Sequence, residues 1–148
     1  MQLSPVSIVA ACASALVACS SPSTRPAPVA PAALGGPASR VVELPPTPGA
    51  GEPREVRVLI DEPALKLATI VLRPGATLPE HRTSVPVTIT ALQGSGVVVV
   101  GGERLRVDAG HAVVLRPSVA HAVEPDDGSA LVLLVHHLGR AEAEAHHH

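Results

Sequence analysis

The 148-residue chain contains no Phe, Trp or Tyr, and ten of its eleven basic residues are arginine. Without aromatic rings it lacks the stacking surfaces of single-strand binders, and a net charge of −2 gives no electrostatic attraction for phosphates. We therefore expect no nucleic-acid partner. Sugar-binding sites also usually need flat rings. A core must be built from Val, Leu, Ile and Ala, which can pack well because shape and volume matter more than aromatic content.

Cysteine is nearly absent as well, and both cysteines, Cys12 and Cys19, lie in an apolar N-terminal run, "SIVAACASALVAC". The run has the length of a signal peptide and is too short to span a bilayer comfortably. We predict a signal peptide over residues 1–18, so the mature chain keeps at most one cysteine. An internal disulfide is then excluded, and the fold must be stable without one.

The end of the apolar run, Leu16-Val17-Ala18-Cys19, resembles the lipobox of bacterial lipoproteins. The resemblance implies cleavage before Cys19, a lipid on Cys19 and a chain anchored in the cell envelope, facing the periplasm or the exterior. One departure from the pattern is that no Lys or Arg precedes Arg25. The alternative is an ordinary secretory signal cut after Ala18, which would give a secreted protein.

Residues 19–54 are rich in Pro, Ala, Ser and Gly, a composition that buries little and favours extended conformations. We expect a disordered tether between the lipid anchor and a folded domain. Val41–Leu44 is either a first strand that docks on the domain or plain linker. Residues 139–148 are expected to be a flexible tail, and the His146–His148 run is either native or a tag remnant.

Residues 55–138 show the pattern of an all-β domain, with short apolar segments separated by turn residues and no helical period. Gly101-Gly102 is typical of a tight hairpin, since glycine tolerates positive φ. Even spacing of short strands predicts a single small barrel or sandwich. The strands are predicted at 56–60, 65–72, 85–92, 97–100, 104–107, 112–115, 120–124 and 130–136.

Two histidines are predicted to face the interior, because side chains alternate between the two faces of a strand. His81 shares a face with a largely apolar set that includes Val85, Val87 and Ile89. His121 shares a face with Val123. This assignment treats residues 81–91 as one continuous face.

Two spacings in the folded part resemble the motifs of the cupin family, a double-stranded β-helix or small jelly-roll barrel. Motif 1 is Gly, five residues, His-x-His, three or four residues, Glu, six residues, Gly; motif 2 is Gly, five residues, Pro-x-Gly, two residues, His, three residues, Asn. Every spacing is present, with these residues at the motif positions: Gly75, His81, Thr83, Val87 and Gly94, then Gly110, Arg116, Ser118, His121 and Pro125.

The resemblance implies a barrel-centred site whose usual ligands to a divalent transition metal are two His and a Glu of motif 1 and a His of motif 2. Only His81 and His121 match, because Thr83 and Val87 stand at the other two positions. A site for such a metal normally needs three protein ligands. We therefore predict an incomplete metal site, with no cofactor assigned and a divalent transition metal as the alternative.

Other side chains are candidates for substitute ligands. Glu80 points away on a regular strand, and His111 stands beside a turn where exposure is expected. His136 and His137 end the last strand with one facing inward, and His136 would give a three-histidine site if it reached the pocket. Arg82 and Arg116 are either rim charges or partners for an anionic ligand.

Three function classes follow from these observations. The first is a binding or sensing domain in which His81, Thr83, Val87 and His121 line a pocket for a small carbonyl or carboxylate compound. The second is a metal-dependent dioxygenase, isomerase or lyase that uses His81, His121 and an unidentified further ligand. The third is a structural module, in which both histidines are satisfied in the core. The valine-rich segment 96–100 suits either a homodimer surface or the core.

Overall fold

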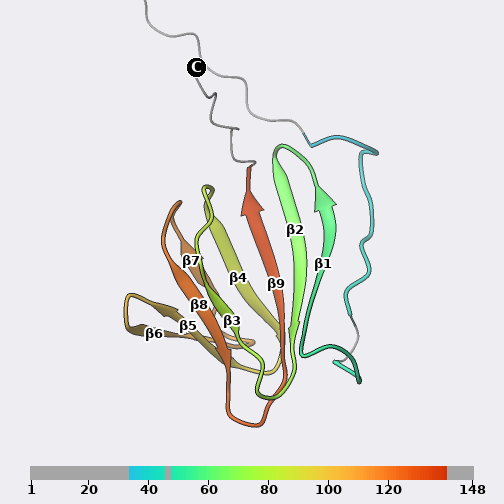
Figure 1. Ribbon diagram of the computed structural model, residues 1–148. Coiled ribbons are helices and arrows are strands. Elements are labelled where there is room, and N and C mark those ends of the chain that lie inside the picture. Colours follow the sequence, from blue (N-terminus) through green and yellow to red (C-terminus); the bar gives the residue numbers. More distant parts are fainter. Residues whose placement is uncertain (1–33, 46–47, 140–148) are drawn as a thin grey trace, which may run out of the picture.

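The computed structural model describes residues 34–45 and 48–139, and these contain nine strands and no helix (Figure 1). The strands are β1 (Arg54–Asp61), β2 (Leu65–Leu72), β3 (Leu78–His81), β4 (Val87–Gln93), β5 (Gly96–Val100), β6 (Glu103–Val107), β7 (Val113–Leu115), β8 (His121–Pro125) and β9 (Leu131–Leu138). Among the described residues, no helix could cross a membrane. The predicted signal peptide, Cys19 and the tail from residue 140 lie outside this part of the chain.

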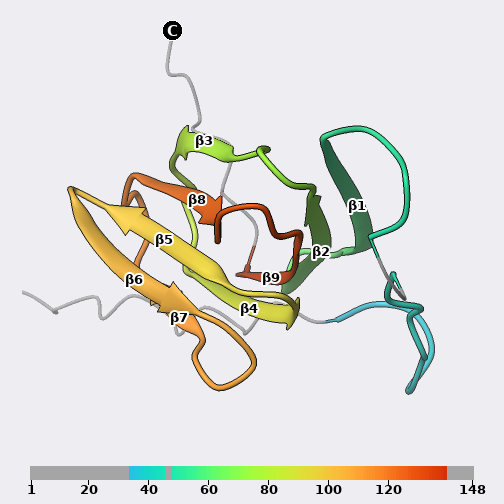
Figure 2. The same cartoon turned by 90° about the horizontal axis from the view of Figure 1, so that it is seen from below.

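The strands form two antiparallel sheets that face each other as a small barrel open at one end (Figures 1 and 2). One sheet has the order β1-β2-β9-β4-β7, and the other has the order β3-β8-β5-β6. Neighbours such as β2 and β9 are far apart in sequence, which is the topology of a jelly roll. The predicted all-β barrel is confirmed.

Every predicted strand is present, with ends within two residues of the prediction. The strand missed is β3, whose sequence Leu-Pro-Glu-His contains no β-branched residue and has a proline, both unfavourable signals for a strand. Val41–Leu44 forms no strand, and Val41 and Leu44 are exposed, so the linker alternative is the correct one for this segment.

The core lies between the sheets and is entirely aliphatic. Its members come from the inner faces of β2, β4 and β9 on one side and of β5, β6 and β8 on the other: Ile70, Leu72, Val87, Ile89, Val98, Val107, Val123, Leu131, Leu133 and Val135, among others. Branched side chains of similar volume fill the space without rings. Among the residues that the structure describes, the buried polar ones are Thr69 and His121. His121 therefore stands out in an otherwise apolar interior.

Candidate functional site

The two predicted site histidines lie side by side at the open end of the barrel. His81 on β3 is the register partner of His121 on β8, and their ring centroids are 4.3 Å apart with the planes tilted by 54°. His121 is 2% exposed, as predicted, whereas His81 is exposed at the edge of the sheet. We call these two residues the histidine pair.

The prediction that residues 81–91 form one continuous strand face was wrong. The chain leaves the four-stranded sheet after His81, passes through a loop and enters the five-stranded sheet at Val87. Alternation does hold within β4, where Val87 and Ile89 are buried. His81 and Val87 therefore belong to opposite walls of the barrel.

A register shift in β3 brings His81 to its partner. Leu78 pairs with Val123, yet His81, three positions later, pairs with His121, two positions earlier. The extra residue is typical of a β-bulge, which re-aims the following side chain. Without it, Leu78 and His81 would lie on opposite faces. With it, Leu78 packs against the core while His81 contacts the His121 ring.

Backbone carbonyls set the tautomer of both rings. His81 Nδ1 lies 2.9 Å from the Pro79 carbonyl oxygen, and His121 Nδ1 lies 3.0 Å from that of Val119. A carbonyl oxygen only accepts hydrogen bonds, so each Nδ1 donates and each Nε2 carries the lone pair in the neutral ring. Burial lowers the pKa of His121, and a charge on His81 lowers it further. The neutral form of the His121 ring is therefore favoured.

A second group of polar residues lies on the opposite sheet, at the same end of the barrel. Asp61 pairs with Lys66, Lys66 with His137, and His137 with Val87 across β1, β2, β9 and β4. Val87 is 1% exposed and belongs to the core, which places its row on the inner face. We call Asp61, Lys66 and His137 the polar row.

His137 occupies a partly buried position in this row, and its Nδ1 is buried without a hydrogen-bond partner. Burial lowers its pKa, and the positive charge of Lys66 lowers it further, with smaller effects from His81 and His121. The polar row and the histidine pair thus lie within electrostatic range of each other.

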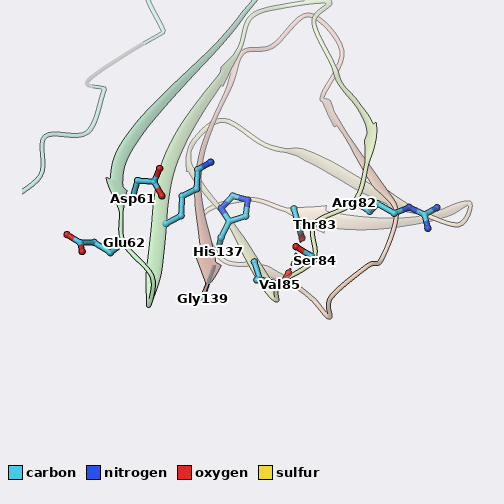
Figure 3. Close-up of a pocket in the computed structure, with 9 residues that line it drawn as sticks. Asp61, Glu62, Arg82, Thr83, Ser84, Val85, His137 and Gly139 are labelled. Atoms are coloured by element: carbon cyan, nitrogen blue, oxygen red, sulfur yellow. Dashed lines mark hydrogen bonds between the residues drawn. The ribbon is translucent and has the colours of Figure 1, made fainter. Parts of the chain in front are cut away.

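A cavity of about 550 Å³ opens beside the polar row, and neither His81 nor His121 is among its lining residues (Figure 3). It is lined by Asp61, Glu62, Lys66, Arg82, Thr83, Ser84, Val85, His137 and Gly139. In Figure 3, the His137 ring points toward Thr83, while Arg82 extends away from it. Thr83 Oγ1 donates to the Val85 carbonyl oxygen at 3.0 Å, which leaves the Thr83 oxygen as an acceptor toward other groups.

The comparisons with known proteins agree with this architecture. Residues 68–137 match the family of the cupin domain. These residues are a cupin domain. No curated protein matches the sequence.

Solved structures share the cupin fold at low sequence identity. An RmlC-like cupin family protein with a double-stranded β-helix fold from Methanocaldococcus jannaschii is 18% identical, covering 70% of this chain and 94% of that one with a TM-score of 0.61. A predicted oxalate decarboxylase from Thermotoga maritima is 20% identical over 59% and 81% of the two chains, with a TM-score of 0.53. A DMSP lyase from Ruegeria pomeroyi is 21% identical with a TM-score of 0.55, over 61% of this chain but 49% of its own. At these identities the likeness establishes the fold alone.

The positions of the usual cupin metal ligands can now be tested for a metal ion. His81 and His121 offer imidazole nitrogens as ligands. The Thr83 hydroxyl group donates its proton to a backbone carbonyl oxygen. Val87 lies in the core and does not line the cavity. Within residues 34–45 and 48–139, no three or more His, Cys, Asp or Glu side chains are grouped to hold a metal ion. A transition metal normally needs three such ligands, so this donor set does not fit the usual cupin centre.

The other candidate residues are distributed as follows. His136, which would have completed a three-histidine site if it reached the pocket, is on the face opposite His137, and its Nδ1 lies 3.1 Å from Thr88 Oγ1. The hypothesis that His136 reaches the pocket was wrong. The segment "LVLLVHH" is apolar on both faces, so the alternation of its side chains does not indicate which face points inward. His111 is exposed, as predicted, and its Nδ1 lies 2.8 Å from Asp108 Oδ1. Glu80 and Arg116 are exposed and do not line the cavity.

Sequence reasoning missed Asp61 and Lys66 as site residues, and of His136 and His137 it considered His136 as the ligand. Lys66 is the only lysine of the chain and lies in a strand of otherwise apolar residues, a signal that could have drawn attention to it. Asp61 looks like part of a turn in the sequence. It reaches the row only because of a register shift between Val58 and Ile60.

Proposed function

We propose that this cupin domain binds a small organic molecule at the open end of its barrel. The observation that carries the proposal is the polar row, which lines a cavity of about 550 Å³ together with Arg82 and Thr83. The volume falls within the range of small-molecule pockets, about 300–1,000 Å³. Convergent polar groups in an otherwise apolar barrel are the usual features that orient such a ligand.

A fragment screen by nuclear magnetic resonance would test this proposal. Ligands that shift the ring signal of His137 should lose affinity in His137→Ala, because the His137 ring lines the cavity. His111→Ala is the matched control, because His111 is exposed and pairs with Asp108 away from the cavity. If no compound in a broad library perturbs the cavity residues, the binding function is wrong.

A metal-dependent enzyme is the second candidate, and one observation favours it. Each ring of the histidine pair donates Nδ1–H to a backbone carbonyl, which is the arrangement that orients metal-ligating histidines. The small number of metal-ligating side chains at these positions argues against a metal-dependent enzyme. Elemental analysis of protein with His146, His147 and His148 changed to Ala would decide between the two. A stoichiometric metal that disappears in His81→Ala and His121→Ala would favour the enzyme.

We further propose that the chain is a lipoprotein anchored in the bacterial cell envelope through Cys19. The support is the sequence pattern Leu16-Val17-Ala18-Cys19 at the end of an apolar run. In a bacterial host, the protein should sediment with membranes, while Cys19→Ser should not carry lipid. A wild-type protein of unlipidated mass in the soluble fraction would favour secretion instead. A homodimer stays a proposal, to be checked by light scattering.

A further inference from the structure

The chain that precedes β1 is bonded to the domain at two points. Residues 34–45 and 48–53 run alongside β1, from the end with the β1–β2 turn to the opposite end (Figure 1). The first part is bonded to Glu62 in the β1–β2 turn, and the second part to Arg73, directly after β2. The two anchors therefore lie at opposite ends of β2. We call residues 34–45 the strap.

The anchor at Arg73 fixes the chain directly before β1. The Arg73 guanidinium donates to the carbonyl oxygen of Gly49 at 2.6 Å, to that of Glu52, and to the Glu55 carboxylate at 2.9 Å. The Arg73 backbone N–H also donates to the Pro53 carbonyl oxygen at 2.9 Å. The Arg73 side chain is only 15% exposed. Several charge-assisted hydrogen bonds at a shielded cation make this anchor strong.

The strap is held at its other end by one carboxylate. Glu62 Oε2 accepts from the backbone N–H of Gly35 at 3.3 Å, and Glu62 Oε1 accepts from both terminal nitrogens of Arg40 at 3.4 Å. These bonds are longer than those at Arg73, and the two side chains of the ion pair keep contact with solvent. Exposed ion pairs contribute little to stability. The strap can therefore be released while the anchor at Arg73 holds.

The pattern of burial agrees with a docked strap. Within the strap, Val41 is fully exposed while the next residue, Val42, is partly buried. In β2, Leu67, Thr69 and Val71 alternate with residues of the core and so face away from the barrel interior, yet all three are buried. A covered outer face between the two anchors is the result that a docked strap predicts.

The turn to which the strap is bonded also forms one wall of the cavity. Asp61, Glu62 and Lys66 all line it. The turn is closed by two backbone hydrogen bonds between Glu62 and Leu65, of 3.0 and 3.2 Å. In Figure 3, the Glu62 carboxylate points away from His137. Glu62 thus belongs to the cavity wall while its carboxylate faces the strap, so a strap that fixes Glu62 also fixes this wall.

We propose that the strap is a two-state regulatory element, which holds the cavity wall in place when docked at Glu62 and loosens it when released. Among the described residues, the strap is the first part of the chain to be bonded to the domain, and it is bonded at this wall. A force or a partner acting on the chain before the strap would therefore change the cavity. By linkage, a molecule that stabilises the wall would in turn favour docking.

Tryptic cleavage after Arg40 measures release of the strap in the full chain. Arg25 is followed by a proline, which blocks trypsin, so Arg40 is the first susceptible residue. Cleavage requires an open segment, and its rate follows the population of the released strap. Glu62→Gln should accelerate this cleavage about two- to fivefold, the range for loss of an exposed ion pair. Glu80→Gln, the same change at an exposed residue outside the cavity lining, should have no effect.

Lys66 reports on the cavity wall, because it is the only lysine of the chain. Acetylation by an N-hydroxysuccinimide ester, followed by mass spectrometry of the peptide that contains Lys66, measures the accessibility of its amine. Arg40→Gln removes the ion pair without changing a cavity residue, and it should raise the acetylation rate at least about twofold. Glu80→Gln is again the control, and circular dichroism confirms that each variant is folded.

The two readouts separate docking from coupling. Equal cleavage rates in wild type and Glu62→Gln would overturn the docking of the strap at Glu62. Faster cleavage combined with an unchanged rate of Lys66 acetylation would show a strap that is docked but not coupled to the cavity, and would overturn the regulatory role. Neither readout uses a ligand, so failure of the proposed binding function would appear only in the fragment screen.

Discussion

Ser118 occupies the motif position at which cupins have glycine, and it has a φ of 65°, in the left-handed region. A side chain costs roughly 1–2 kcal/mol there, while glycine loses about 0.5–1 kcal/mol more entropy on folding. Ser118→Gly should therefore raise the free energy of unfolding by about 0.5–1 kcal/mol. Ser118→Ala, which keeps the Cβ, should leave it nearly unchanged. Urea unfolding followed by circular dichroism measures both, and a less stable glycine variant would contradict the strain argument.

Asp108 provides a second prediction at the residue scale. The His111 ring and Gly110 N each donate to its carboxylate at 2.8 Å, and they lower its pKa from 3.8 to about 2. A depressed carboxyl pKa stabilises the fold above the unfolded-state value, and this stability is lost as the pH falls from 3.8 through about 2. A carboxyl-carbon titration should show the low midpoint, and His111→Ala should move it toward 3.8. An unmoved midpoint would exclude His111 as the main cause.

At the scale of elements, the β4–β5 turn requires glycine at Gly94 for two reasons, its positive φ and the lack of space for a side chain. Gly94 has a φ of 74°, and a Cβ added there would collide with the carbonyl oxygen of Ala130. Gly75 has a comparable φ of 84° but no atom within 4 Å of an added Cβ. The two glycines therefore separate backbone strain from steric overlap.

Gly75→Ala should cost only the strain, about 1–2 kcal/mol, while Gly94→Ala should cost roughly 1–3 kcal/mol more because the β8–β9 loop must move. Denaturant unfolding of the two variants measures the difference. Equal losses would mean that the loop at Ala130 yields freely and that the overlap has no energetic consequence.

At the scale of the whole molecule, burial of His121 and His137 couples stability to pH. Burial lowers both pKa values, so below the ordinary histidine value of 6.5 the unfolded chain binds protons that the folded chain does not. The free energy of unfolding should therefore decrease as the pH falls below 6.5, until the folded-state values are reached. Since the chain has no Trp or Tyr, circular dichroism at pH 7.5 and about 5 is the suitable measurement.

The contribution of each ring can be assigned by substitution. His137→Gln should reduce the loss of stability between those two pH values, because one of the responsible groups is gone. His111→Gln serves as the control, since that ring is exposed. A pH dependence that is unchanged in His137→Gln would show that another group is responsible.

The sequence by itself determined the strands, the turns and the inward direction of His121. These depend on local patterns: apolar residues alternate with a period of two, and glycines stand where the chain reverses. Motif spacing then indicated the barrel, because its glycines and histidines recur at the separations typical of cupins. β3 was missed for the same reason, since Leu-Pro-Glu-His carries no local strand signal.

Only the tertiary structure decided which side chains meet. His81 reaches His121 through a bulge in β3, and Asp61, Lys66 and His137 form one row through the registers of β1, β2 and β9. Register between strands far apart in sequence depends on the packing of the whole sheet, and a shift of one residue reverses the direction of every side chain. That is why His137 lines the cavity and His136 does not.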